Sequence, residues 1–505
     1  MEQGHWNMRA RIAGLALLTG LAFVLPAGAA EPTMAPVPEV AGPILGPVIS
    51  QHRLDLPGAP LAYEARFAER ELADAAGKRL ATLSATAYLR QPLDPTRPVL
   101  FAFNGGPGAS SSPLHFGAFG PRLIERAADG SRTLVDNPHT PLVDADLVFI
   151  DPVGTGFSRV LPGGDGQPFW SVDGDARAVL DLIREWLREN GRTASPVYIA
   201  GESYGGFRLA TLAKDAGDLN LSGLILISPL LDASASEAAV GNDLPHIFRL
   251  PSYAVAAWRH GKTKAKGDAG DVVTVFNEAA SFAQSDYALA LLQGTRLPAA
   301  DRQRIARRVA DLTGLDVATV LEQDLRVPTD LFVDRLLADQ GLRVGRLDAR
   351  VTAPLPKHEV AGRPAAANDP SLGLGRSNVI ISAPATRYFQ QELGLPAGRD
   401  YVSLTLDVNF RWDFRPAGPG TQYYVNPTAN IAALLRDKPG LRLLLVGGYY
   451  DLAVPVLAAR YAIDHAGIPP DRFTEALFDA GHSPFEGESN RARMRAMLQG
   501  FIRGQ

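Results

Sequence analysis

Cysteine is absent from all 505 residues of the chain. Disulfides, thiolate nucleophiles and zinc sites built on thiolates are therefore excluded. A strong excess of one charge is also missing, because the formal net charge at pH 7 is −4. Proteins that bind nucleic acid or anionic membranes carry basic patches or stripes, and the chain shows no such run. The charge pattern thus argues against both classes of partner.

No internal repeat at a fixed period is found, which argues against a solenoid. The composition is otherwise that of an ordinary globular protein, with 46% hydrophobic and 21% charged residues. The 49 glycines and 39 prolines fit a loop-rich enzyme better than a coiled coil.

The first thirty residues have the pattern of a secretory signal peptide. Two arginines precede the apolar stretch Ile12–Leu25, and the small residues of Ala27–Ala30 follow it. A membrane anchor is the alternative, but this stretch is short for a membrane span. We therefore expect an exported protein, periplasmic or secreted, that begins near Glu31 and has no stable membrane partner.

Short apolar runs of Val, Ile and Leu dominate the sequence from residue 99 onward. Runs of this kind are typical of strands buried on both faces, as in a mostly parallel sheet covered by helices. An earlier stretch, Leu83–Leu89, alternates apolar and polar residues and predicts a half-exposed strand. Helical stretches are expected at 173–189 and 207–215. The five apolar runs are Val99–Phe103, Leu147–Ile150, Val197–Ala200, Leu224–Ile227 and Leu441–Val446.

The sheet pattern stops after Ser228 and resumes only at Leu441. A gap of roughly 200 residues is too long for a loop, and it contains helical stretches at 300–312 and 329–340. We interpret it as an inserted, largely helical cap. The predicted division is a signal peptide at 1–30, an irregular proline-rich arm at 31–47, the first part of the core at 48–232, the cap at 233–435 and the second part of the core at 436–505.

A serine flanked by glycines lies between the third buried run and the helix after it. The segment is Gly201–Gly206, with Ser203 at its centre. A strand-to-helix turn of this kind is the setting of a nucleophile elbow, and the turn is too tight for side chains at its glycines. The helix N-terminus also favours developing negative charge. Ser203 is the predicted nucleophile; the alternative is a tight turn with an incidental serine.

A serine hydroxyl needs a base, and the base needs a group that orients it. In proteins with a nucleophile elbow, the order of the three residues along the chain is serine, acid, histidine. His482 follows the apolar run 476–478 and is the predicted base. Of the other histidines after Ser203, three fall in the cap and one in an expected helix, so structural roles are favoured for them. These four are His246, His260, His358 and His465.

Asp451 is the predicted acid because it lies on the loop after Leu441–Val446. Asp479 is the rival, but it is only three residues from His482. A helix N-cap is the alternative role for Asp451.

A glycine-rich loop, Asn104–Ser111, follows the strand that ends at Phe103. A phosphate cradle is the alternative reading, but the loop lacks Gly-Lys-Ser/Thr and Pro107 removes a backbone donor. In a hydrolase such a loop supplies one N–H of the oxyanion hole, and the residue after the nucleophile supplies the other. Those donors would be Gly106 and Tyr204.

Together these segments resemble the serine carboxypeptidase family, peptidase family S10. The resemblance implies an α/β-hydrolase fold with a mostly parallel central sheet, flanking helices and an inserted largely helical cap. It also implies removal of the C-terminal residue from peptides with a free C-terminus, without cofactor or metal. It leaves the oligomeric state open. The matching segments, in order, are Asn104–Gly108, Pro152–Ser158, Gly201–Gly206, Asp451 and Gly481–His482.

The resemblance further implies that Asn104, Glu202 and the backbone of Gly105 bind the carboxylate of the substrate. An ionised Glu202 would repel that carboxylate, whereas a protonated one would donate a hydrogen bond. Substrate binding should therefore weaken as pH rises through the titration of Glu202. The sequence departs from the family at Ala118, where many members carry a second glutamate. The lack of cysteine, with a cleavable signal, suggests a bacterial exported member.

Three other functions fit parts of the pattern. An esterase or another peptidase could use the same Ser-Asp-His triad, and it would not depend on a free carboxylate in its substrate. An acyltransferase would pass the acyl group to an alcohol instead of water. A non-catalytic binding protein could retain the fold, but binding alone does not require an intact triad.

Overall fold

The structure is a computed structural model that describes residues 39–56, 59–127, 131–236, 239–263, 271–356, 368–374, 377–415 and 425–504. The predicted signal peptide, residues 31–38 of the predicted arm and His358 lie outside these ranges. None of the helices in these ranges combines the length and apolar character that a membrane crossing requires.

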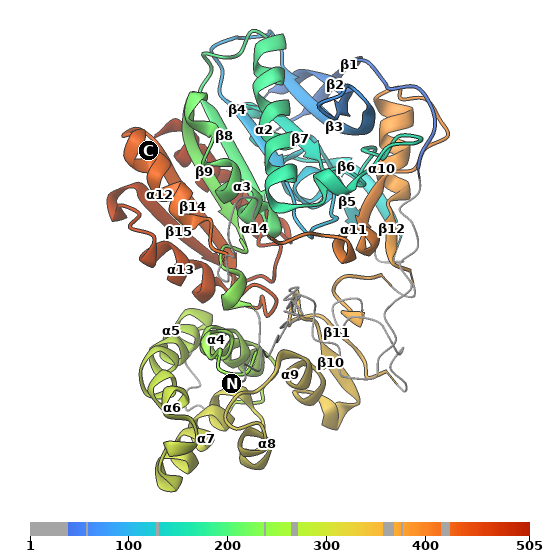
Figure 1. The fold of residues 1–505 in the computed structure, drawn as a ribbon. Coiled ribbons are helices and arrows are strands. Elements are labelled where there is room, and N and C mark those ends of the chain that lie inside the picture. The colour runs from blue at the N-terminus through green and yellow to red at the C-terminus, as the bar shows by residue number, and fades with distance from the viewer. Residues whose placement is uncertain are drawn as a thin grey trace, which may run out of the picture.

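A nine-stranded sheet forms the centre of the described chain (Figure 1). Six neighbouring strands, β7 to β15 in the order below, are parallel, and the first three strands pair antiparallel. Each of the five apolar runs lies in one of the parallel strands, except that Leu441 precedes β14. In spatial order the strands are β1 (Val48–Asp55), β2 (Pro60–Ala73), β3 (Arg79–Arg90), β7 (Asp146–Asp151), β4 (Val99–Phe103), β8 (Val197–Glu202), β9 (Leu221–Ile227), β14 (Arg442–Gly448) and β15 (Phe473–Phe478).

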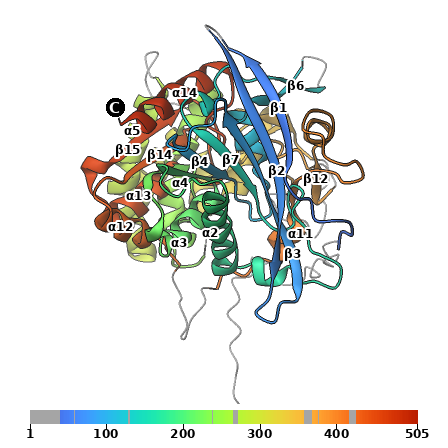
Figure 2. The same cartoon turned by 90° about the horizontal axis from the view of Figure 1, so that it is seen from above.

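Two hydrophobic cores lie on the two faces of this sheet. In β4, Val99, Phe101 and Phe103 belong to one core, and Leu100 and Ala102 belong to the other. Because successive side chains of a strand point to opposite faces, a strand covered on both sides needs apolar residues at every position. Helices from opposite sides complete the cores (Figure 2). They are α2 (Val172–Glu189), α3 (Tyr204–Leu212), α12 (Thr428–Asp437) and α13 (Val456–His465) on one side, and α10 (Ala383–Arg387) and α14 (Glu488–Arg503) on the other.

The prediction of a half-exposed strand at Leu83–Leu89 is wrong in its exposure. These residues lie in β3, which is buried over most of its length between β2 and β7. The alternating polar side chains are short enough to be buried with hydrogen-bond partners. Ser84, for example, shares a hydrogen bond of 2.9 Å with the hydroxyl of Ser158. Small hydroxyl side chains with hydrogen-bond partners can therefore be buried in a strand. Their alternation with apolar residues gives the same sequence pattern as a strand with one face in solvent.

Two expected helices end earlier than predicted. Helix α3 stops at Leu212, and the chain continues as a turn in which the N–H groups of Lys214 and Asp215 bond three residues back. Helix α9 (Thr329–Arg335) likewise gives way to a separate 3₁₀ turn at Ala338–Gln340. Such tightening of the last turn satisfies carbonyl groups that the helix end would otherwise leave free.

Apart from α12, the described residues between β9 and β14 form two regions. The first is a helical lobe that lies below the sheet in Figure 1, with α4 packed on the sheet body through a contact between the rings of Phe248 and Tyr461, 5.0 Å apart. Its elements are α4 (Leu244–Arg259), α5 (Val272–Phe282), α6 (Ala288–Gln293), α7 (Ala299–Thr313), α8 (Val317–Glu322), α9, and the hairpin of β10 (Leu342–Val344) and β11 (Thr352–Pro354).

The second region lies against the sheet body itself. It contains the paired strands β12 (Val379–Ile381) and β13 (Val402–Thr405), with α10 and α11 (Leu406–Phe410). Backbone hydrogen bonds join β13 to the glycine-rich loop and to the segment Pro152–Ser158. The N–H of Ser110 donates to the carbonyl of Ser403, and the N–H of Gly156 donates to that of Val402. A smaller hairpin, β5 (Arg122–Arg126) and β6 (Arg132–Asp136), follows α1 (Ser112–Leu114) and a π-helical turn, His115–Phe119.

Candidate active site

Ser203 occupies the turn between β8 and α3. Its backbone has φ 62° and ψ −128°, a region that L-residues adopt only under strain. Within the segment 201–206 it is the one residue that is not buried. The glycines are required by space, because a Cβ on Gly201 would overlap the carbonyl of Gly205. The fold therefore presents the Ser203 hydroxyl at the carboxyl end of the parallel strands, with a strained backbone beneath it.

His482 and Asp451 form a direct pair. His482 Nδ1 lies 2.6 Å from Asp451 Oδ2, and the side chain of Asp451 is buried. The other carboxylate oxygen accepts hydrogen bonds from the N–H groups of Ala453 and Val454, both at 2.9 Å. Asp451 thus caps a turn with one oxygen and holds the imidazole with the other. It is not the N-cap of α13, where Pro455 stands.

The remaining candidates lie apart from this pair. Asp479 is exposed, and its backbone carbonyl accepts from Arg350. His260 and His465 contact the backbone carbonyls of Ala349 and Tyr461. Burial, with nearby Arg249, lowers the pKa of His246 to about 4, which fits a neutral structural histidine.

Among the hydrogen bonds that join described residues, none links the Ser203 hydroxyl to His482. Catalytic hydrogen bonds are often long before substrate binds and shorten in the complex. The neighbours of the two residues are in contact: Ser483 Oγ donates to Glu202 Oε1 at 3.0 Å. This bond brings the turn at Ser203 and the loop of His482 together.

The glycine-rich loop lies directly on the elbow. A Cβ on Gly105 would overlap the backbone nitrogen of Tyr204, so only glycine permits this approach. The loop turns on a hydrogen bond from Ala109 N–H to Gly105, and within 104–108 Gly106 is the one exposed residue. The two predicted oxyanion donors, Gly106 and Tyr204, therefore belong to adjoining stretches of backbone.

Glu202 is fully buried between polar partners. Its Oε2 accepts from Asn104 Nδ2 at 2.6 Å, and Asn104 Oδ1 accepts from the N–H of Leu114 at 3.2 Å. Burial raises the pKa of Glu202 to about 7, although His482 and the hydrogen bonds of Ser483 and Asn104 oppose the shift. The structure therefore brings Asn104 and Glu202 together, as predicted for a carboxylate-binding pair.

Two opposing effects of its surroundings set the pKa of His482. Burial alone lowers the pKa of the imidazole, but the carboxylates of Asp451 and Glu202 outweigh it and raise the pKa above its ordinary value. These carboxylates stabilise the imidazolium that a general base forms when it accepts a proton.

Several supporting residues were not identified from the sequence. Arg208 of α3 is fully buried, pairs with Asp175 of α2 and donates to the carbonyl of Asn104 at the end of β4. Asp151 accepts from both the N–H and the hydroxyl of Ser111, at 2.8 and 2.7 Å, and from Tyr401 at 3.0 Å. Burial raises the pKa of Asp151 to about 6. Only Asp151 and Ser111 had any signal in the sequence, because they lie beside segments that resemble the serine carboxypeptidase family.

A strap from the inserted region contacts both loops of the acid–base pair. The N–H of His482 donates to Leu347 at 2.7 Å, and the N–H of Ala349 donates to Tyr450 at 3.1 Å. Residues 346–350, which no motif marked, therefore help to hold Asp451 and His482 in place.

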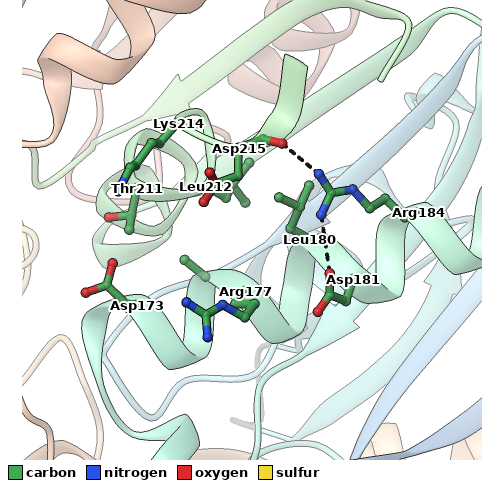
Figure 3. Close-up of a pocket in the computed structure, with 10 residues that line it drawn as sticks. Asp173, Arg177, Leu180, Asp181, Arg184, Thr211, Leu212, Lys214 and Asp215 are labelled. Carbon is green, nitrogen blue, oxygen red and sulfur yellow. Dashed lines mark hydrogen bonds and ion pairs between the residues drawn. The ribbon is translucent and has the colours of Figure 1, made fainter. Parts of the chain in front are cut away.

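A separate groove of about 340 Å³ lies between α2 and α3 (Figure 3). It is lined by charged residues that are partly committed to one another: Arg184 bonds to Asp181, to Asp218 and to the carbonyl of Asp215. None of the predicted site residues lines it. In the described part of the chain, no group of three or more His, Asp or Glu side chains is placed to hold a metal.

Comparisons with known proteins found similar chains and one similar fold. Residues 88–250 match the family model described as serine carboxypeptidase. Serine carboxypeptidase-like 36 of Arabidopsis thaliana is 33% identical over 27% of this chain and 29% of its own length. Serine carboxypeptidase-like 50 of the same plant is 29% identical over 50% of this chain and 52% of its own length. The chain thus spans about half or less of these relatives.

A solved structure is similar over most of the chain. The crystal structure of Kex1(delta)p, a prohormone-processing carboxypeptidase from Saccharomyces cerevisiae, has a TM-score of 0.53. The two share 15% sequence identity over 87% of this chain and 91% of that one. At this identity the likeness concerns the fold, and with the parallel sheet and flanking helices it confirms the α/β-hydrolase fold.

The buried Glu202 predicts a pH-dependent effect of Glu202→Gln on stability. The folded chain binds the Glu202 proton more tightly than the unfolded chain, so this stabilising contribution is present below pH 4.5 and is lost as pH rises through about 7. Glutamine cannot ionise. The free energy of unfolding of Glu202→Gln, relative to the parent, should increase by about 3 kcal/mol between pH 4 and pH 8.

Urea unfolding at the two pH values measures this difference. Glu189→Gln, at a half-exposed position on α2, serves as the control, and the change with pH for Glu202→Gln should exceed that of the control. A difference for Glu202→Gln that does not vary with pH would contradict the raised pKa.

Proposed function

We propose that this chain is a serine-type carboxypeptidase that removes the C-terminal residue of peptides through an acyl-enzyme. The observation that carries the proposal is the junction of two constellations: the Asp451–His482 pair beside the Ser203 elbow, and the Asn104–Glu202 pair next to both. The first is suited to acyl transfer, and the second to a substrate with a free carboxylate.

In the proposed reaction Ser203 Oγ attacks the carbonyl carbon of the last peptide bond. His482 takes the hydroxyl proton and passes it to the leaving amine, while Asp451 holds the imidazolium by its Nδ1–H. The N–H groups of Gly106 and Tyr204 stabilise the oxyanion, each by about 3 kcal/mol. Water, deprotonated by His482, then releases the peptide and regenerates the serine.

The carboxylate of the substrate would be bound by Asn104 and Glu202, with the Gly105 backbone helping. A protonated Glu202 adds a hydrogen-bond donor to the site, whereas an ionised and buried Glu202 repels that carboxylate. The pKa of about 7 leaves Glu202 protonated at acidic pH. The proposal therefore includes stronger substrate binding below pH 7 than above it.

Helix α11 supports the oxyanion hole in this proposal. Asn409 Nδ2 donates to the carbonyl of Pro107 at 3.1 Å, and the N–H of Thr405 donates to Gly108 at 2.8 Å. Trp412 Nε1 donates to the hydroxyl of Tyr204 at 3.1 Å. Residues 405–412 thus contact both the glycine-rich loop and the residue after the nucleophile. These contacts hold the two oxyanion donors in position relative to each other.

We further propose that the protein is exported, to the periplasm or outside the cell, after cleavage near Ala30. The proposal rests on the two arginines, the apolar stretch Ile12–Leu25 and the small residues that follow it. The same segment and the lack of cysteine support a bacterial source. Sequencing the N-terminus of the protein recovered from the periplasm or medium tests this, and an N-terminus that retains residues 1–25 would refute it.

Matched dipeptides with a blocked N-terminus test the activity. The protein should hydrolyse the form with a free C-terminal carboxylate, with a KM about tenfold lower at pH 5 than at pH 8 because Glu202 loses its proton between them. The C-terminal amide of the same dipeptide should show a higher KM that changes little with pH. Initial rates at both pH values measure this.

Ser203→Ala, checked for folding by circular dichroism, should lose all turnover and all labelling by a fluorophosphonate. A folded Ser203→Ala protein that retains activity would overturn the proposed nucleophile. An active wild-type protein with equal KM for acid and amide would instead support an esterase or another peptidase on the same triad.

Asn409→Asp should lower kcat about tenfold with little change in KM. The aspartate has the same shape but cannot donate to Pro107, and one such hydrogen bond is worth about 1.4 kcal/mol. A peptide boronic acid, which places an anionic oxygen in the hole, should lose affinity in parallel. Asp407→Asn on the same helix is the control; an Asn409→Asp enzyme with unchanged kcat would show that α11 does not position the oxyanion donors.

A further inference from the structure

The hydroxyl of Ser483 contacts the buried carboxyl group of Glu202, and Ser483 itself is partly exposed. Its oxygen is 3.0 Å from Glu202 Oε1, and Ser483 is half-buried whereas Glu202 is only 2% exposed. Ser483 also follows His482 directly, so it borders the place where the reacting bond must lie. No motif in the sequence marked this residue.

The hydrogen bonds around Glu202 decide which of its oxygens can carry a proton. The N–H of Leu114 donates to Asn104 Oδ1, which orients the amide so that Nδ2 faces Glu202 Oε2. An amide NH₂ group donates and does not accept. A proton on Glu202 must therefore sit on Oε1, where its partner is the hydroxyl of Ser483.

A hydroxyl group can donate and accept at the same time, unlike the amide on the other side. When Glu202 is ionised, Ser483 Oγ–H points to Oε1 and donates to it. When Glu202 is protonated, the Oε1–H group donates to Ser483 Oγ, and the serine hydrogen is free to turn toward a ligand. The bonds reverse direction, and no proton leaves either residue.

We infer that Ser483 is a further carboxylate-binding residue, which relays the protonation state of Glu202 to the C-terminal carboxylate of the substrate. The inference rests on the proposed function. In the protonated state the chain of donors runs from Glu202 to Ser483 and from Ser483 to the substrate. In the ionised state Ser483 donates to Glu202 instead, and the substrate carboxylate loses that donor.

Other charged groups near Glu202 set the balance between the two states. His482 favours the ionised carboxylate, whereas burial and the charge of Glu486 favour the protonated one. Ala118 is buried and carries no carboxyl group that could supply a second proton. The site therefore depends on a single proton at Glu202 and on one hydroxyl group that can reverse its hydrogen bond.

Ser483→Thr and Ser483→Val form the test, because their side chains have nearly the same shape and only threonine keeps the hydroxyl. Both variants and the wild type are assayed with the blocked dipeptide acid and its C-terminal amide at pH 5 and pH 8. For Ser483→Val, KM for the acid at pH 5 should rise about tenfold and become nearly independent of pH. Ser483→Thr should keep the low KM and the pH dependence of the wild type.

Turnover of the amide and labelling of Ser203 by a fluorophosphonate separate this role from support of His482. In Ser483→Val both should fall by much less than the tenfold rise in KM for the acid, and neither should change in the control Ser285→Ala in the helical lobe. If Ser483→Val keeps the acid-to-amide ratio of KM and its pH profile, the inference is overturned. It is also overturned if kcat falls equally for both substrates, which would assign Ser483 to the positioning of His482.

A wild-type protein that prefers the acid but has a pH-independent Ser483 effect would overturn the inference and leave the proposed function standing. A wild-type protein that labels at Ser203 but does not distinguish acid from amide would overturn both the proposed carboxylate recognition and this inference.

Discussion

The burial of one carboxyl group, that of Glu202, organises the site. Burying an ionisable group without partners is costly, so the surrounding chain must supply hydrogen bonds to it. The partners come from opposite parts of the sequence: Asn104 from the loop after β4, and Ser483 from the loop after β15. Satisfying Glu202 therefore requires those two loops to meet at the end of β8, beside Ser203.

The same requirement links recognition to chemistry. Ser203 follows Glu202 in the chain, and Ser483 follows His482. A carboxylate bound by Glu202 and Ser483 therefore lies close to the nucleophile and its base. The charge of Glu202 also contributes to the raised pKa of His482, while His482 opposes the raised pKa of Glu202. The two groups are electrostatically coupled, so a carboxylate ligand at one changes the proton affinity of the other.

The inserted residues do more than cover the sheet. The strap at 346–350 bonds to the loops of Asp451 and His482. Asn409 of α11 bonds to the glycine-rich loop, and Trp412, just after α11, bonds to Tyr204. Every loop of the site thus receives at least one contact from residues between β9 and β14. An insertion that buttresses catalytic loops can alter their geometry without changing any residue that touches the substrate.

The sequence by itself determined the parallel strands, the elbow at Ser203 and the glycine-rich loop, because contiguous residues encode each of them. Unbroken apolar runs are what a doubly covered strand requires, and only glycine fits where Gly105 and Gly201 meet neighbouring backbone. Local pattern failed at β3, where buried hydroxyl groups imitated an exposed face, and at the ends of α3 and α9. The tertiary structure alone decided which oxygen of Asp451 holds His482, that Ser483 donates to Glu202, and that α11 and the 346–350 strap brace the site. These contacts join residues far apart in sequence, and no short-range pattern records a pairing that only the order of the strands creates.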